Sequence, residues 1–130
     1  MNEQADPAYA DIEIYLANTE LGDIISWLKH RFLSVALDTQ ATDSATTHHF
    51  LAKTETTNVN ITIVERILDG YSSVFFDSPN TPWEVDLDCA RDAHRHLQVE
   101  VRCCAGSWSP EQNPDEWLSI CQEGETVITW

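Results

Sequence analysis

Two spacings of apolar residues alternate along the chain and predict its elements. In residues 11–18, Ile12, Ile14 and Leu16 alternate with more polar neighbours, which is the period of a β-strand. Residues 19–32 change to helical spacing, and Thr19 stands where an N-cap is expected. The apolar face of this helix consists of Leu21, Ile24, Ile25, Leu28 and Phe32.

The middle of the chain predicts strands, and a second helix follows them. Strand patterns cover residues 34–39, 49–55, 59–67 and 71–77, with a loop at 40–48 and turns at 56–58 and 69–70. Thr81, Pro82 and Glu84 have the order of N-cap, N1 and N3, which predicts a capping box and a helix that continues to Leu97.

The last third predicts a strand, a loop and a closing hairpin, at 98–104, 105–116, and 117–121 with 126–130. This order indicates an α+β fold, in which two helices pack on one face of a mainly antiparallel sheet. A ferredoxin-like βαββαβ core with extra strands fits it, although architecture alone implies no function. We expect a polar N-terminal tail at 1–10 and one domain at 11–130.

Charge is the most unusual property of the composition. The 130 residues include 22 acidic and 7 basic ones, for a formal net charge of −15. Such a surface repels phosphate backbones and anionic lipids, so neither nucleic acid nor a membrane is an expected partner. A basic protein is the better candidate, and the alternative is that the charge only keeps the protein soluble.

The N-terminal residues and the lack of a long apolar run predict a cytoplasmic protein. The first residues, MNEQADPAYADIE, lack the basic and apolar regions of a signal peptide, and no apolar run is long enough to span a membrane. Cys89, Cys103, Cys104 and Cys121 are therefore expected to be reduced thiols.

The stretch DAHRHLQVEVRCCAG, at 92–106, carries residue types that bind metals. Helical geometry separates His94 from His96 by about 200° around the axis, and strand geometry puts Cys103 and Cys104 on opposite faces. We therefore expect no local chelate and no cofactor. The surviving alternative is a long-range metal or enzyme site, built from His48 or His49 with His94, His96 and Cys103.

Catalysis has little support from the sequence. Cys104 would need a histidine brought near it by the fold, and its acidic surroundings would raise the pKa of the thiol. No GxSxG motif and no phosphate-binding loop are present. We expect a protein that is not an enzyme and name no catalytic residue.

The expected function is therefore binding. Glu84, Asp88 and Asp92 share helical spacing, as either a solvated face or an acidic ridge for a basic partner. Trp108 lies in a loop, where it either plugs the core edge or anchors a partner beside Asp115 and Glu116. An inhibitor, an immunity protein or an adaptor would have these features, as a monomer or a homodimer.

Overall fold

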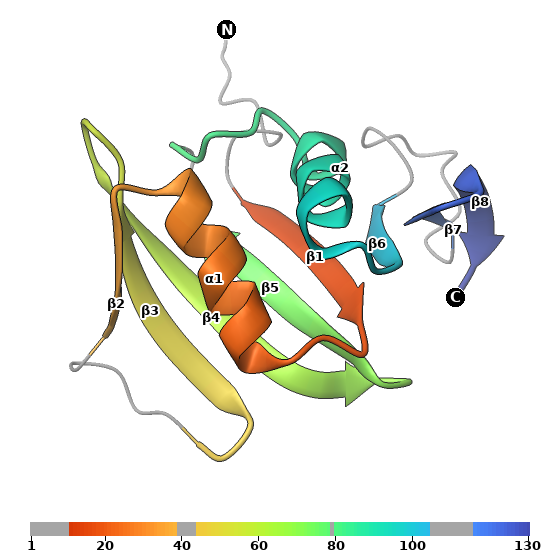
Figure 1. Cartoon of the computed structure of the whole chain (residues 1–130), viewed down its shortest axis with the longest axis horizontal. Helices are drawn as coiled ribbons and strands as arrows, with labels where there is room; N and C mark the ends of the chain where they lie inside the picture. The colour runs from red at the N-terminus through yellow and green to blue at the C-terminus, as the bar shows by residue number, and fades with distance from the viewer. Residues whose placement is uncertain (1–10, 39–43, 79, 105–115) are drawn as a thin grey trace, which may run out of the picture.

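A computed structural model describes residues 11–38, 44–78, 80–104 and 116–130. Its main feature is one eight-stranded sheet in the order β2-β3-β4-β5-β1-β6-β7-β8 (Figure 1). The strands are β1 (Ile12–Ala17), β2 (Ser34–Leu37), β3 (Thr47–Lys53), β4 (Asn58–Leu68), β5 (Tyr71–Asp77), β6 (Val101–Cys104), β7 (Glu116–Cys121) and β8 (Gly124–Thr129). The helices are α1 (Leu21–Arg31) and α2 (Asp86–Leu97).

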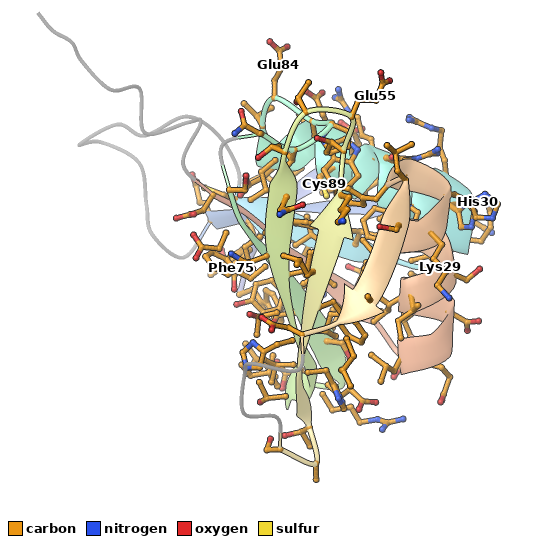
Figure 2. All side chains as sticks on the ribbon, turned by 90° about the vertical axis from the view of Figure 1, so that its left-hand side faces the viewer. Lys29, His30, Glu55, Phe75, Glu84 and Cys89 are labelled. Atoms are coloured by element: carbon orange, nitrogen blue, oxygen red, sulfur yellow. The ribbon has the colours of Figure 1, made fainter. Side chains whose placement is uncertain are left out.

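Both helices lie on the same side of the sheet (Figures 1 and 2). The β1 side chains alternate as the sequence predicts, since Ile12, Ile14 and Leu16 are buried while Tyr15 is only half-buried. The register carries this alternation across the sheet, because Ile14 pairs with Val74 and Tyr15 with Arg102. We call the side that carries α1 and α2 the covered face, and the other side the open face.

The core lies between the covered face and the helices, and its centre is aromatic. Trp27 of α1 is 0% exposed and stacks on Trp83, with ring centroids 5.6 Å apart. Phe76 of β5 contacts both rings edge-on. The indole N–H of Trp27 has no hydrogen-bond partner among the described residues. This packing ties α1 and the segment before α2 to the middle of the sheet.

Two predicted N-caps, Thr19 and Thr81, are wrong. The predicted start of the second helix is therefore wrong as well. α2 begins at Asp86 after Val85, and Thr81 donates its hydroxyl to the carbonyl of Trp83 instead of capping a helix. Burying a large aromatic side chain stabilises by about 2 kcal/mol, more than a typical cap, so the chain stays non-helical around Trp83. Thr19 likewise donates to the carbonyl of Ala17, and Glu20 occupies the N-cap of α1.

Other boundaries follow the sequence closely. The predicted turn at Asp69 and Gly70 is confirmed. Their φ angles, 51° and 82°, are both positive, as a two-residue hairpin turn of type I′ requires. β3 begins at Thr47, inside the expected loop at 40–48, and β6 begins at Val101 because Gln98 ends α2 in a left-handed conformation. The expected tail at 1–10 lies outside the described residues.

The prediction of a mixed α+β fold with an antiparallel sheet is confirmed, and the sheet is larger than expected. All seven strand pairings of the described sheet are antiparallel. A ferredoxin-like sheet is also antiparallel, so this pairing does not decide the ferredoxin-like arrangement, which stays a prediction. Neither helix is long and apolar enough to span a membrane.

Candidate functional site

The expected acidic ridge on the second helix does not form as one row. Glu84 precedes α2 and is exposed, and Asp88 is half-buried. Asp92 is only 5% exposed, because its carboxylate accepts two bonds from Arg31, at 2.5 and 2.7 Å, and one from the indole N–H of Trp83 at 2.9 Å. Burial by itself would raise the pKa of Asp92, but these bonds and the nearby guanidinium charges outweigh it and lower the pKa. Asp92 is therefore a structural anion that joins α1 to α2.

A shallow cavity of about 480 Å³ opens beside this ion pair. Three of its lining residues are arginines, and Arg91 is held by Glu125 of β8 through a two-bond ion pair of 2.7 and 2.9 Å. The full lining is Arg31, Pro82, Trp83, Asp88, Arg91, Asp92 and Arg95. With three cations and two anions, this part of the helix surface is not acidic.

Cations gather on the helices of this acidic protein. Four of its seven Lys and Arg residues lie on α1 and α2, namely Lys29, Arg31, Arg91 and Arg95. The exposed rings of His30 and His96 join them, with centroids 4.8 Å apart. Figure 2 shows Lys29 and His30 on the helix side, opposite Phe75. The acidic excess must therefore be carried by the rest of the molecule.

Most of the residues predicted to bind a partner in the loop before β7 lie outside the described residues. Trp108 and Asp115 fall there, so whether Trp108 plugs the core or anchors a partner stays a prediction. Glu116, the first residue of β7, is exposed.

The residues of the alternative metal site do not come together. His48 contacts Glu65 across β3 and β4 at 2.8 Å, while the Nδ1 of His94 contacts the carbonyl of Val99 at 2.8 Å. Cys103, on β6, is buried, and His96 is exposed. Within the described ranges, no three His, Cys, Asp or Glu residues are arranged to hold a metal ion.

The four cysteines are free thiols. Cys103 is buried and Cys104 exposed, as their alternation on a strand predicts. Burial raises the pKa of Cys89 well above its ordinary value, and burial together with the charge of Asp86 raises the pKa of Cys103 to about 12. Neither buried thiol has the lowered pKa of a nucleophile.

An unexpected group of carboxylates lies where β1 begins and β5 ends. Asp11, Glu13, Asp77 and Asp86 form this group, which we call the anionic end. Burial, with the charges of Glu13 and Asp11, raises the pKa of Asp86 to about 6. Burial and the neighbouring Asp77 raise the pKa of Asp11. In the described part of the chain, none of the four forms an ion pair with a cation.

The open face carries a cluster of aromatic rings on β1, β5, β7 and the end of β8. Its members are Tyr15, Tyr71, Trp117 and Trp130, which we call the aromatic cluster. Neighbouring centroids lie 5.0 to 5.4 Å apart, mostly in edge-to-face geometry. The guanidinium carbon of Arg102 lies 4.5 Å from the ring centroid of Tyr71 and 4.6 Å from that of Trp130. The cluster therefore already binds one guanidinium group.

Glu100, the residue before β6, holds Arg102 and the rings in this arrangement. It accepts bonds from the hydroxyls of Tyr71 and Ser119, at 2.6 and 2.5 Å, and from the Nε of Arg102 at 3.0 Å. Burial opposes ionisation of Glu100, but these three donors outweigh it and lower its pKa. The carboxylate therefore fixes Arg102 against the rings.

Sequence reasoning missed both groups. Tyr15 stands at an outward position of its strand, between Glu13 and Ala17, and an aromatic residue on the polar side of a strand is the available signal. Nothing in the sequence places Tyr71, Trp117 and Trp130 beside Tyr15, because that contact depends on the strand order.

Comparison with protein-family models, with curated proteins and with solved structures found no match to this chain. The geometry of the chain itself therefore carries the functional inference.

Proposed function

We propose that the protein is a non-enzymatic acidic binding protein whose partner is a basic protein, as in an inhibitor, an immunity protein or an adaptor. The observation that carries this proposal is the anionic end. Four carboxylates share one end of the sheet and form no ion pair with a cation in the described part of the chain. Burial, together with repulsion by neighbouring carboxylates, raises the pKa values of Asp11 and Asp86. A partner's Lys or Arg side chains would relieve that repulsion.

Internal pairing supports the proposal. Four of the seven Lys and Arg residues are in ion pairs with carboxylates of the same chain, namely Arg31, Arg66, Arg91 and Arg102. These four cations are therefore paired with carboxylates outside the anionic end. A field of this kind accelerates encounter with a basic protein more than it strengthens the final complex.

The proposal includes a cytoplasmic location. Four free thiols in one small chain suit a reducing compartment, since an oxidising one favours disulfides. Whether the protein acts as a monomer or a homodimer stays a prediction.

The test is charge reversal at the anionic end. The immobilised chain is exposed to native lysate, and proteins are eluted with a salt gradient and identified by mass spectrometry. The association rate of the basic protein that elutes at the highest salt is then measured. The double variant Asp11→Lys/Asp77→Lys should slow association about tenfold at low salt, because steering is lost.

The matched control is Asp23→Lys/Glu123→Lys, which changes net charge equally at exposed positions away from the anionic end. It should slow association less than about twofold. Equal slowing by both variants would mean that the net charge of the protein, and not the anionic end, steers the association. The absence of any basic protein above low salt would overturn it.

A further inference from the structure

We propose that the open face of the sheet, from the anionic end to the aromatic cluster, is the docking surface for an arginine-bearing segment of the basic partner. This inference rests on the proposed function and adds where and through which side chains the partner binds. The occupant is a segment of another protein whose guanidinium groups contact the rings of Trp117, Trp130 and Tyr15.

The helix side is a poor surface for such a partner. A basic segment on α2 would meet Arg95 and the ion-paired Arg91, with Lys29 and the ion-paired Arg31 on the neighbouring helix. Asp92, which the sequence offered as a contact, is buried and saturated by three hydrogen bonds. Like charges across an interface oppose binding of the wrong surface. The ridge predicted from Glu84, Asp88 and Asp92 is therefore not the surface that we propose.

The open face has complementary charge. Glu13 lies beside the aromatic cluster, since the hydroxyl of Tyr15 donates to its carboxylate at 3.4 Å. Asp69 lies at the other side of the cluster, where it accepts a bond from the indole N–H of Trp130 at 3.0 Å. The one arginine within the cluster, Arg102, is neutralised by Glu100. The rings are thus bordered by carboxylates that a cationic segment could reach.

The rings themselves favour a guanidinium. Tyr15, Trp117 and Trp130 are half-buried, so each keeps part of its surface available beside the described residues. The contacts of Arg102 with Tyr71 and Trp130 show that the spacing of the cluster accepts a planar cation at van der Waals range. Arginine stacks on aromatic faces and pairs with carboxylates through a planar fork, whereas lysine acts as a hydrated point charge. The proposal therefore distinguishes arginine from lysine.

The experiment uses two 12-residue peptides as probes, one of Gly–Arg repeats and one of Gly–Lys repeats. Each is titrated into the full-length chain labelled with ¹⁵N, and the indole N–H signals of assigned tryptophans are followed by NMR. The Arg peptide should shift the signals of Trp117 and Trp130 and leave those of the buried Trp27 and Trp83 in place. The Lys peptide should bind about fivefold more weakly.

Variants test the rings directly. Trp130→Ala should weaken binding of the Arg peptide about fivefold, because one cation–π partner is lost. The control Leu37→Ala truncates an exposed apolar side chain on β2, at the far edge of the sheet, and should change the affinity less than about twofold. Asp88→Lys, on the helix side, should also leave binding nearly unchanged.

Two results would overturn the docking surface without touching the proposed function. One is a peptide-induced shift confined to Trp83, beside the helix cavity, with Asp88→Lys abolishing binding. The other is no shift of Trp117 or Trp130 while the captured basic protein still binds in a salt-dependent way. Failure of the function itself would show as no captured basic protein at all.

Discussion

The two faces of the sheet use aromatic residues in opposite ways. On the covered face, Trp27 and Phe76 are 0% exposed and Trp83 is 8% exposed, and they meet helices and other rings. On the open face, Trp117 and Trp130 are half-buried and lie among carboxylates and an arginine. Residue type alone therefore does not separate a buried core residue from a partly exposed one on the sheet surface.

The polar atoms of the rings do not by themselves separate the faces, because the indole N–H of the buried Trp83 also donates to a carboxylate, that of Asp92. The hydroxyl of Tyr71 and the indole N–H of Trp130 reach carboxylates on the open face. The indole N–H of Trp27 has no partner among the described residues, which is tolerable only because the ring gains so much from burial. The rings of the covered face stabilise the fold by burial, whereas the polar atoms of Tyr71 and Trp130 on the open face are bonded to carboxylates of the same chain.

The largest expected effect is a difference in the free energy of unfolding between truncating a ring on the covered face and truncating one on the open face. Trp27→Ala should lower the free energy of unfolding by about 4 kcal/mol, because it leaves a cavity in the core. Trp130→Ala should cost about 1 kcal/mol, since its ring is half-buried after the last strand. Urea denaturation followed by far-UV circular dichroism measures both. Similar losses for the two variants would mean that the open face is a second core.

A smaller effect is expected at the ion pair between the helices. Asp92→Asn removes the charge that Arg31 faces and should cost about 2 kcal/mol at pH 7, a value reduced because Arg31 is partly exposed. The folded state lowers the pKa of Asp92, so its stabilisation is present at neutral pH and is lost as the pH falls through that lowered value. Asp88→Asn is the control and should change stability little at any pH.

The smallest effect belongs to the anionic end and has the opposite sign. The pKa of Asp86 is raised to about 6, so its folded form favours the proton, and stability is lost as the pH rises from about 4 through 6. Asp86→Asn removes this loss. Relative to wild type, its free energy of unfolding should rise by about 1 kcal/mol between pH 4.5 and pH 7.5, after allowance for solvent screening. Denaturation at the two pH values measures the difference, and a constant offset would contradict it.

The sequence predicts where the helices and strands lie along the chain better than it predicts which of them pack against one another. Alternation in β1 and the helical spacing of α1 are local, and the structure confirms both elements. The start of α2 fails because Trp83 enters a core formed by Trp27 and Phe76, which come from other elements. Local cap signals contribute about 1 kcal/mol, so a distant packing partner can override them.

The candidate site could be predicted only in part. The net charge is readable from composition, and it led to a basic partner, which stays a proposal. The location is not readable, because Asp92 is removed from the surface by Arg31, a residue 61 positions away. The anionic end likewise depends on the pairing of β1 with β5, which brings Asp11 beside Asp77.

The place of β1 in the sheet has a consequence for how the chain is made. β1 emerges from the ribosome before the other described strands, yet its neighbours are β5 and β6, which begin at Tyr71 and Val101. Until they arrive, the apolar row of Ile12, Ile14 and Leu16 has no strand to pair with. Forming such distant contacts is slow, and unpaired strand edges promote aggregation, so we expect the folding of β1 to wait until the second half of the chain has been synthesised.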